Sequence, residues 1–413
     1  MTEHDLASPA AAPTSDLPSA LRGVRVIDAA TLAAGPLVAT MMAEFGADVI
    51  KVEQPVVGDP MRDWGARKND VGLVWKSIAR NKRCITLNLR MTAGQLLFHQ
   101  LAATADVVIV NARASALRRW NICWDDLHAV NDQLVMLHVS GYGAGGPKSD
   151  QPGFGTLAEA MSGFAHLTGE PDGPPTLPSF MLADGVASQS ATWAVMMALY
   201  AREVHGAGGQ LVDVSLLEPL SRLIEMAALT YDQTGTIPGR VGNRWDASVP
   251  RNAYPTADGR WIAVSSAAPA IIRRIYQAID RPGLAEDPDY VDPVLRVARA
   301  DEIDTMVADW ISARTLAEAM AVFEAAEVTA APIYDARQLI EDPHFTARGM
   351  YVSLPDDDLG QLRVQGPVVR MSGTPGRVEH LGPAVGAHND EVYPALLGLS
   401  PARLAELRTD GVI

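Results

Sequence analysis

Residues 177–200 place a carboxylate in a setting that suits covalent chemistry. The second half of this stretch carries small and apolar residues at helical spacing, Ala187 and Ala191 among them, which predicts a buried helix. Asp184 and Gly185 stand at the front of that predicted helix. Unpaired backbone N–H groups and the positive end of the helix dipole favour an ionised carboxylate there. An ionised Asp184 among small residues, with room for a substrate, is the kind of group that acts as a covalent nucleophile.

Asp184 also fits a plainer structural role. Aspartate is common at the N-cap of helices, where its side chain accepts hydrogen bonds from the first unpaired N–H groups. The two roles are compatible, because a capping carboxylate at an open helix end still faces any ligand that approaches it. From these residues alone, Asp184 is a nucleophile, a helix cap, or both.

Composition describes an ordinary globular protein. The 413 residues are 48% hydrophobic and 20% charged, and this length predicts two domains. Only two cysteines, Cys84 and Cys123, are present, which predicts neither a disulfide framework nor a metal cluster and favours a reducing cytoplasm. The longest apolar run, residues 194–201, is too short to cross a bilayer, so no membrane partner is expected. The first twenty residues have neither the basic start nor the apolar middle of a signal peptide, which predicts a disordered leader.

The charge of the chain is strongly negative but unevenly distributed. A net charge of −15 argues against nucleic acid as a general partner. Between Lys51 and Trp120, however, twelve basic residues stand against five acidic ones. A local positive field on an acidic protein suits a phosphorylated small ligand better than a polymer. The alternative is a mixed, solvated face.

The opening of the chain has the pattern of a parallel α/β sheet. Residues 21–29 alternate like a strand, Ala33–Pro36 predicts a turn, residues 37–45 predict a helix, and residues 47–53 predict a second strand. A strand, a helix and a strand in this order form a βαβ unit. The pattern continues with predicted strands at 84–89, 106–111 and 134–140 and a predicted helix at 93–103. The first 150 residues or so therefore predict a doubly wound α/β domain.

A glycine-rich run, GYGAGG at residues 141–146, formally matches the dinucleotide-binding fingerprint. The match fails in context, because Pro147 and a polar, glycine-containing stretch follow where a helix must open to receive the pyrophosphate. We interpret the run as a flexible loop that lines a pocket, and we expect no nicotinamide cofactor.

The middle of the chain predicts a second, smaller domain. After a strand and helix over residues 208–229, the Gly- and Arg-rich residues 235–251 predict a linker, and residues 252–266 predict a hairpin. Helical patterns cover 268–279, 299–312 and 316–326. Strands near Tyr351 and Val364 and two short helices in the tail complete the chain.

Taken in order, several stretches resemble the class III CoA-transferase family, which includes formyl-CoA transferase, carnitine CoA-transferase and α-methylacyl-CoA racemase. The resemblance is carried by LRGVRVIDAATLAAGP, GADVIKVEQPVVGDPMRDW, NKRCITLNLR, ADVVIVNARASALRRW, VSGYGAGGP, LADG, GGQLVDVSLLEPL and the tail from LGPAVGAHNDEVYPALL onward. It implies an α/β fold with a doubly wound, Rossmann-like large domain, an inserted smaller α+β domain, and an interlocked homodimer. The implied boundaries are a leader at 1–20, a large domain at 21–225 and 336–413, and a small domain at 226–335.

The resemblance also assigns the candidate site. In the transferases the catalytic group is an aspartate just before a small-residue helix, which is the position of Asp184. The implied cofactor is coenzyme A, bound as an acyl-CoA substrate, with no metal, nicotinamide or flavin. The matching coenzyme A positions are Ala34, Gly35, Pro36, Asn81, Lys82, Arg83, Asn111, Arg113, Gly141, Gly143 and Lys148. Around Arg113 the chain departs from the Asn-Phe-Arg-Pro-Gly-like run of most relatives, and Arg62 is a further candidate for a phosphate.

Two branches of the family differ in their chemistry. The racemases move an α-proton with a histidine, and Phe154 stands at that position, so racemisation is disfavoured. His166 lies twelve residues further on and is expected to be structural. The transferase branch implies an exchange of coenzyme A between two acids through an aspartyl anhydride and an aspartyl-CoA thioester. The alternatives are a racemase on the same fold and a non-catalytic subunit of a heteromeric transferase. Glu159 is either a pocket acid or a surface charge.

Overall fold

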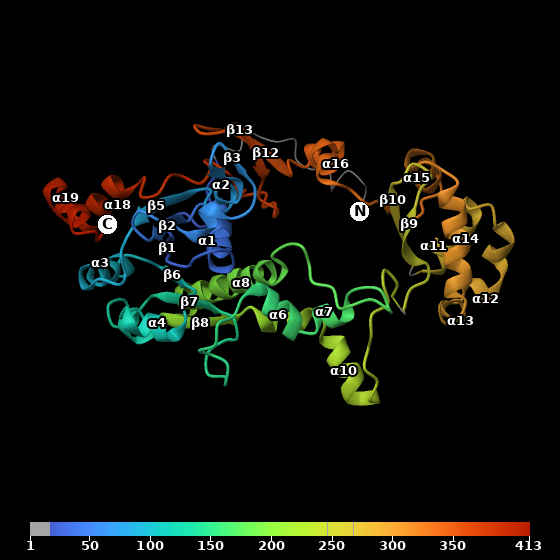
Figure 1. Cartoon of the computed structure of the whole chain (residues 1–413), viewed down its shortest axis with the longest axis horizontal. Helices are drawn as coiled ribbons and strands as arrows, with labels where there is room; N and C mark the ends of the chain where they lie inside the picture. The colour runs from blue at the N-terminus through green and yellow to red at the C-terminus, as the bar shows by residue number, and fades with distance from the viewer. Residues whose placement is uncertain (1–16, 246, 267) are drawn as a thin grey trace. The chain divides into compact units, whose positions relative to one another are not determined.

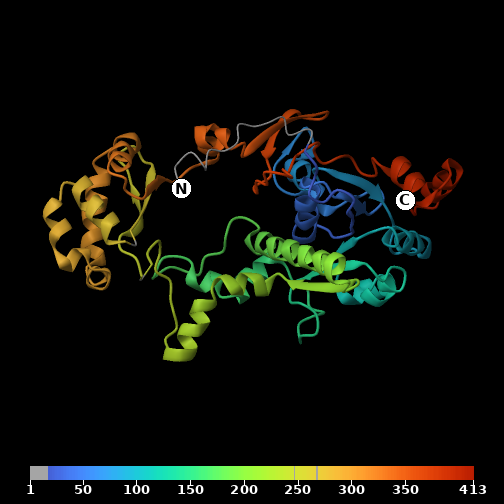
Figure 2. The same cartoon turned by 180° about the vertical axis from the view of Figure 1, so that it is seen from behind.

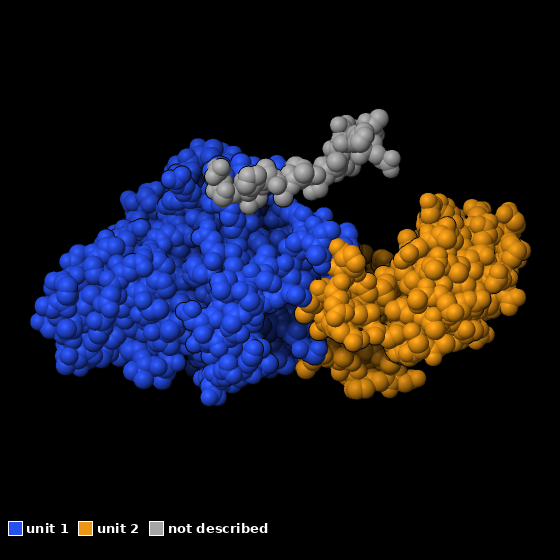
Figure 3. Space-filling model, turned by 90° about the horizontal axis from the view of Figure 1, so that it is seen from above, with its two compact units in different colours: residues 1–164, 178–225, 344–413 blue, residues 165–177, 226–343 orange. Residues whose placement is uncertain are grey.

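The computed structural model describes residues 17–245, 247–266 and 268–413 of the chain. The leader expected at residues 1–20 therefore lies almost wholly outside the described residues. The described chain forms two compact units, blue and orange in Figure 3. The larger unit contains the residues up to 164 with 178–225 and 344–413, and the smaller contains 165–177 and 226–343. Each unit has its own hydrophobic core.

The larger unit is built on a six-stranded, entirely parallel sheet (Figure 1). Its strands are β1 Arg25–Asp28, β2 Asp48–Glu53, β5 Lys82–Thr86, β6 Val107–Val110, β7 Val135–Ser140 and β8 Gln210–Ser215. They lie in the order β5-β2-β1-β6-β7-β8, which is the doubly wound 3-2-1-4-5-6 order of dinucleotide-binding folds. The predicted parallel α/β sheet is confirmed.

Both faces of this sheet are buried, which explains its nearly continuous apolar strands. One face packs on helices α1 Ala34–Glu44 and α8 Leu182–His205. The other packs on α3 Thr92–Ala102, α18 Asn389–Leu397 and α19 Pro401–Thr409. Alternation within a strand divides the residues: Val26 faces the first layer and Ile27 the second. The same two layers are seen from behind in Figure 2.

Helix α8 is the element on which the candidate site depends. Small residues recur every four positions along its inner face, where Ala183, Ala187 and Ala191 are fully buried against α1. Small side chains let the two helix backbones approach closely. The helix ends at Gly206, whose φ of 64° gives the left-handed cap that glycine adopts without strain. The predicted helix is confirmed, but it begins at Leu182, so Asp184 lies inside its first turn.

Shorter elements connect and cover this framework. The Ala33–Pro36 segment, predicted as a turn, is instead the start of α1, because its backbone is already helical from Ala34. The other elements of the larger unit are the 3₁₀-helix η3 Pro60–Asp63, the hairpins β3 Arg67–Lys68 with β4 Val71–Gly72 and β12 Tyr351–Asp356 with β13 Gly360–Gln365, and helices α2 Leu73–Ile78, α4 Ala114–Arg119, α5 Trp124–His128, α6 Gly155–Met161 and α9 Leu217–Leu223. Helices α7 Phe164–Leu167, α10 Glu225–Thr234 and α17 Pro343–Ala347 cross the sequence boundaries of the units.

The C-terminal segment covers the edge strand β5. The side-chain oxygen of Asn389 accepts a hydrogen bond from the Thr86 N–H at 2.9 Å, and its amide donates to the Thr86 hydroxyl at 2.8 Å. The N–H of Cys84 donates to the His388 ring at 3.1 Å. These bonds satisfy strand groups that an open edge leaves unpaired.

The smaller unit is an antiparallel three-stranded sheet with helices on one face. Strands β9 Arg251–Pro255, β10 Trp261–Ser265 and β11 Ala330–Pro332 lie in the order β11-β10-β9, and β9 with β10 forms the predicted hairpin. Its core includes Tyr254, Tyr276 and Phe323. Its further elements are α11 Pro269–Ala278, η4 Pro282–Glu286, α12 Pro288–Val291, α13 Pro293–Val297, α14 Ala300–Ser312, α15 Leu316–Ala325 and α16 Ala336–Glu341. Among the described residues, no helix is both long and apolar enough to span a membrane.

Candidate active site

The candidate site lies at the switch point of the sheet, where the strand order reverses between β1 and β6. Strands β1 and β6 are neighbours, and the loops that leave their carboxyl ends diverge, which is where open α/β sheets bind ligands. Two hydrogen bonds join these loops. The Thr31 N–H donates to the Asn111 side-chain oxygen at 2.9 Å, and the Asn111 amide donates to the Thr31 carbonyl at 2.7 Å.

Buried ions fix the loop after β1 from beneath. Asp28 accepts a hydrogen bond from the Ala30 N–H at 3.2 Å, and Asp59 accepts from the Leu32 N–H at 3.1 Å. The Lys51 ammonium donates to the Ala30 carbonyl and pairs with Asp59 at 2.8 Å and with Asp28 at 3.8 Å. Leu32 needs this support, because its φ of 63° is unfavourable for a residue with a side chain.

The charge on Lys51 is stabilised by its neighbours. Burial by itself lowers the pKa of a lysine, but the carboxylates of Asp28 and Asp59 outweigh burial and raise the pKa of Lys51. The pKa of Asp59 is correspondingly lowered by Lys51, against the effect of its own burial. The loop is therefore held by a charged network at neutral pH.

Asp184 lies in the first turn of α8, beside the start of α1. Burial raises the pKa of Asp184, and the nearby carboxylate of Glu159 raises it further. The N–H groups of Ala34 and of Asp184 itself act in the opposite direction, but they do not prevail. Ser188 bridges the two helices, with its hydroxyl 2.8 Å from the Ala34 carbonyl and 2.6 Å from the Asp184 carbonyl.

Two expectations for Asp184 are corrected by this geometry. The N-cap of α8 is Met181, whose side chain makes no capping hydrogen bond, so Asp184 is not the N-cap of this helix. The ionised form was expected to be favoured by the helix end, yet the pKa of Asp184 is raised. Burial and the neighbouring Glu159 carboxylate outweigh the two N–H groups that favour the ionised form.

Two cavities meet the Asp184 side chain. A cavity of about 410 Å³ has a mixed lining of small apolar residues and polar ones, and the polar ones include Asn111, Arg113 and Ser140. A cavity of about 780 Å³ has mostly apolar lining that includes Trp64, Leu157, Phe180 and Met181. Leu32, Ala33, Phe154 and Asp184 line both. A carboxylate in this position can face a polar and an apolar part of one substrate.

The structure brings some of the predicted coenzyme A residues together. Ala34, Asn111, Arg113 and Gly141 line the smaller cavity with Asp184. Gly141 is required there, because a Cβ on it would lie 2.7 Å from the Gly153 backbone. Gly35 and Pro36 follow in α1, and a Cβ on Gly35 would lie 2.4 Å from the Ala30 side chain.

Other predicted residues lie elsewhere and have structural contacts. The Asn81 amide donates to the Arg377 carbonyl at 2.8 Å. Lys82 is only 1% exposed, and its ammonium donates to Asp28 at 2.9 Å and to the Pro36 carbonyl at 2.6 Å, so protein encloses it. Arg83 pairs with Asp48 and Glu391 at the strand edge. None of Asn81, Lys82 and Arg83 lines either of the two cavities.

Of the residues predicted in the glycine loop after β7, some line the smaller cavity and others do not. Gly143 has a φ of 78° and donates its N–H to the Ser140 hydroxyl at 3.0 Å. Lys148 is exposed and lies 3.4 Å from the Gln151 side-chain oxygen. Gly141 lines the smaller cavity, whereas Gly143 and Lys148 do not.

The basic segment does not form the expected positive field. Most of its cations are paired with carboxylates within the fold. Examples are Arg62 with Glu53 at 2.7 Å, Lys76 with Asp356 at 2.8 Å, and the buried Lys51 and Lys82. The charge count between residues 51 and 120 missed these pairs because several partners, Asp28 and Asp356 among them, lie outside that segment.

Two site features, Gly155 and the Lys51 network, had no signal in the local sequence, and a third, Glu159, had been left open. Glu159 is 3% exposed and lines the larger cavity, which resolves it as a pocket acid. Gly155 lies against Asp184, where a Cβ would be 2.4 Å from Asp184 Oδ2. The Lys51 network depends on residues from three separate segments. His166, as expected, has a structural contact, with its ring 3.1 Å from the Pro238 carbonyl.

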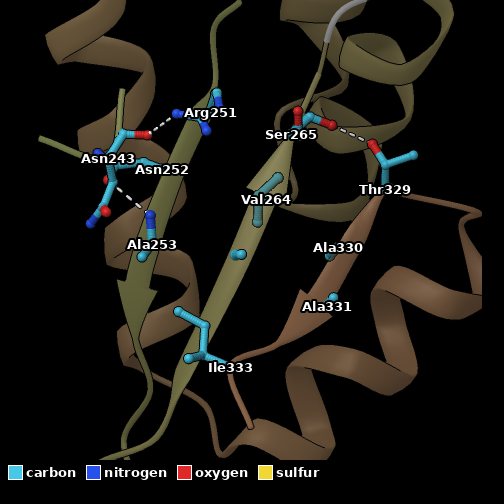
Figure 4. A pocket seen from close by; sticks show the side chains of 11 residues that line it. Asn243, Arg251, Asn252, Ala253, Val264, Ser265, Thr329, Ala330, Ala331 and Ile333 are labelled. Atoms are coloured by element: carbon cyan, nitrogen blue, oxygen red, sulfur yellow. Dashed lines mark hydrogen bonds between the residues drawn. The ribbon is translucent and has the colours of Figure 1, made fainter. Parts of the chain in front are cut away.

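The smaller unit has a cavity of its own, about 620 Å³, on the open face of its sheet (Figure 4). Arg251 lies at its upper end and donates to the Asn243 carbonyl at 2.7 Å, and Ile333 lies at the lower end. The remaining lining is mainly small side chains of β9, β10 and β11. Among the described residues, no group of three or more His, Cys, Asp or Glu side chains is arranged to hold a metal ion.

A doubly wound sheet with cavities at its switch point and a half-buried carboxylate that lines both defines an α/β enzyme for a small organic substrate. The chain belongs to CoA-transferase family III, whose family model matches residues 21–389. It is therefore an enzyme that acts as a CoA-transferase on acyl-CoA and acid substrates. The resemblance inferred from the sequence is confirmed.

Known relatives agree with this assignment. The chain is 40% identical over 397 residues to succinyl-CoA–D-citramalate CoA-transferase of Chloroflexus aurantiacus, covering 96% of this chain and 98% of the relative. It is 38% identical to the succinyl-CoA–L-malate CoA-transferase beta subunit of the same organism, covering 97% and 99%. Among solved structures, a CAIB/BAIF family protein from Brucella suis superimposes with a TM-score of 0.82 at 27% identity, covering 92% and 100%.

Proposed function

We propose that the enzyme moves coenzyme A from an acyl-CoA donor to a carboxylic acid acceptor, with Asp184 as the covalent nucleophile. The observation that carries this proposal is the position of the Asp184 carboxylate, which lines both the smaller cavity, where Asn111 and Arg113 supply polar groups, and the mostly apolar larger cavity. The reacting carbonyl of an acyl-CoA joins a polar coenzyme to an acyl chain, so this position suits it.

The exchange proceeds in balanced steps. An Asp184 oxygen attacks the thioester carbonyl, the C–S bond breaks, and the electron pair leaves on the coenzyme A thiolate. The thiolate then attacks the aspartyl carbonyl of the mixed anhydride, forming an aspartyl-CoA thioester and releasing the donor acid. The acceptor carboxylate attacks this thioester, and the same steps in reverse order give the new acyl-CoA. No net proton is consumed.

The chain supplies position, oxyanion donors and exclusion of water. We place the coenzyme in the smaller cavity against Ala34, Asn111, Arg113 and Gly141, with Arg113 as the cation nearest a phosphate or amide group. The Ala34 N–H already acts on the Asp184 carboxylate and is our candidate donor for the oxyanion that develops there. Because anhydrides hydrolyse, the apolar cavity must exclude water around the acyl group.

The relatives suggest which acids to try first. Two of them are named for succinyl-CoA with D-citramalate or L-malate, and a third, 32% identical, is named a succinate–glutarate CoA-transferase. We therefore propose succinyl-CoA as donor and short dicarboxylic acids as acceptors. Phe154, which cannot move a proton, gives no support to racemisation.

The direct test is capture of the covalent intermediate. The purified enzyme is mixed with succinyl-CoA and quenched within one turnover, and the digested peptides are weighed by mass spectrometry. We expect a coenzyme A adduct on the peptide that contains Asp184. An adduct on another residue, or transfer with no adduct at all, would contradict the proposal.

Gly155 offers an independent test of where the carboxylate must point. In Gly155→Ala the new Cβ would lie 2.4 Å from Asp184 Oδ2, so the carboxylate must rotate away. We expect kcat to fall by roughly 10- to 100-fold, because small displacements of a reacting group are costly. Unfolding stability should not fall, since alanine favours helices.

The matched control for Gly155 is Gly185→Ala. A Cβ at position 185 meets open space, although it follows Asp184 directly in the chain. We expect its kcat to stay within about twofold of the wild type. Equal kcat values in the two variants would show that Gly155 does not determine the position of the carboxylate.

We propose further that the enzyme is an interlocked homodimer with an inserted small domain, acting in the cytoplasm. The outer face of α8 supports a partner, since Trp193, Met197, Tyr200 and Val204 recur at helical spacing and are each more than half exposed. Sedimentation of the purified chain should give a dimer, and Met197→Glu should weaken it. A stable, active monomer would reject the dimer, and activity only with a second, different chain would indicate a heteromer.

A further inference from the structure

Asp184 has an acidic neighbour that the exchange reaction does not itself require. Glu159, on α6, is 3% exposed and lines the apolar cavity together with Asp184. Its Oε1 accepts a hydrogen bond from the Ala183 N–H at 3.2 Å. That N–H belongs to the first turn of α8, where backbone donors lack partners within the helix. The bond therefore fixes the Glu159 carboxylate one residue from the nucleophile.

Helix α6 places two residues beside the Asp184 carboxylate. Gly155 leaves space for Asp184 Oδ2, and Glu159, one helical turn later, adds a negative charge beside it. A fold that needed Asp184 only as a structural acid gains nothing from either feature. Glu159 is buried and Asp184 is half-buried, and two carboxylates that are partly removed from water repel each other more strongly than in water.

We propose that Glu159 is a positioning residue that makes the Asp184 carboxylate more reactive by destabilising its charged form relative to its acylated form. This inference rests on the proposed role of Asp184 as nucleophile. It assigns Glu159 no bond to substrate: it acts through Asp184.

The charge changes during the exchange explain the effect. Before attack, the carboxylates of Asp184 and Glu159 both line the larger cavity, and the attacking Asp184 oxygen carries negative charge. When the Asp184 oxygen bonds to the acyl carbon, that charge leaves on the thiolate, and the anhydride is neutral. The later aspartyl-CoA thioester is neutral too. The repulsion from Glu159 is thus relieved in both covalent intermediates.

The electrostatics of the site agree with this role. Burial contributes most to the raised pKa of Asp184, and Glu159 is the charged neighbour that raises this pKa further. The opposing groups are the N–H groups of Ala34 and Asp184, and Arg113 is the cation that lines the smaller cavity. A carboxylate with a raised pKa is more basic and a stronger nucleophile.

Glu159→Gln separates charge from packing. Glutamine has the same shape and keeps an oxygen that accepts from the Ala183 N–H, but it has no charge. In single-turnover experiments with succinyl-CoA, we expect the rate of adduct formation on the Asp184 peptide to fall about tenfold. We expect KM for succinyl-CoA to change by less than about twofold. The acid limb of the pH–rate profile should move to lower pH, because Asp184 then ionises more readily.

Two further variants make the outcome decisive. Glu159→Asp keeps a charge on a shorter side chain and should keep the acid limb near the wild-type position. Glu203→Gln, at the exposed end of α8, is the matched control and should change neither rate nor profile. A Glu159→Gln enzyme with wild-type rate and an unmoved acid limb would overturn the inference, as would a rate loss with no shift of the limb. If the wild type itself forms no adduct at Asp184, the proposed function fails, and this inference fails with it.

Discussion

Asp184→Asn is expected to abolish CoA transfer while leaving the fold intact. The amide has the shape of the carboxylate but lacks the anionic oxygen that must attack the thioester, so we expect kcat to fall by at least about 10³-fold. The coenzyme A adduct on the Asp184 peptide should disappear in parallel. Mass spectrometry and a transfer assay on the same preparation measure both effects.

Stability provides a second, independent readout for Asp184→Asn. The pKa of Asp184 is raised in the fold, so ionising this group costs stability as the pH rises through that pKa. At neutral pH the variant should therefore be more stable than the wild type, because asparagine has no charge to lose favourable solvation. Below the ordinary aspartate range, near pH 4, the difference should vanish. Retained transfer, or a large loss of stability at neutral pH, would contradict this assignment.

Lys51→Met is expected to have the largest effect on stability. The variant leaves the buried carboxylates of Asp28 and Asp59 without the ammonium that lies between them. Removing one partner of a buried ion pair typically costs about 3–5 kcal/mol. Because the pKa of Lys51 is raised, its contribution is fully present at neutral pH and is lost only under strongly alkaline conditions. Urea unfolding at pH 7 measures the loss.

A double variant distinguishes lost charge balance from lost packing. In Lys51→Met, Lys82 still pairs with Asp28 at 2.9 Å, whereas Asp59 loses the lysine with which it pairs. Asp59 is therefore the carboxylate that the loss of Lys51 destabilises most. Asp59→Asn added to Lys51→Met should recover part of the stability, as a double-mutant cycle shows coupling between contacting residues. Lys68→Met, on the exposed β3, is the control and should cost less than about 0.5 kcal/mol. Equal losses in Lys51→Met and Lys68→Met would contradict the role of the network.

Transfer activity should respond to the same network. The Lys51 ammonium donates to the Ala30 carbonyl, and Asp59 accepts from the Leu32 N–H. Lys51→Met and its double variant with Asp59→Asn should therefore both loosen the loop after β1, which lines the two cavities. We expect kcat of a folded Lys51→Met enzyme to fall at least about tenfold.

Some parts of the fold could be predicted from the sequence because their signals are local. The period-2 strands, the helix with an alanine every four residues, and the hairpin at Asp258-Gly259 each depend on neighbouring residues. Boundaries were less predictable: Pro36 in the Ala33–Pro36 segment suggested a turn, but proline is also well tolerated in the first turn of a helix, where it stands in α1.

In the candidate site, too, some residues could be predicted from the sequence and others could not. Asp184, Asn111, Arg113 and Gly141 could be placed because the chain resembles a known family, and they do line one cavity. The roles of Lys82 and Arg83 could not be predicted, because a cation looks the same in a sequence whether it faces a ligand or a buried carboxylate. Their partners, Asp28 and Glu391, lie 54 and 308 residues away.

By itself, the sequence determined the parallel α/β sheet, the helix that carries Asp184 and membership of a CoA-transferase family, because these depend on residue type and on spacing along the chain. Only the tertiary structure decided the electrostatic state of Asp184. It placed Glu159 beside Asp184, buried the first and half-buried the second, and neutralised the basic segment with distant carboxylates. Burial and charge–charge interactions depend on distances in space, and the order of residues does not contain those distances.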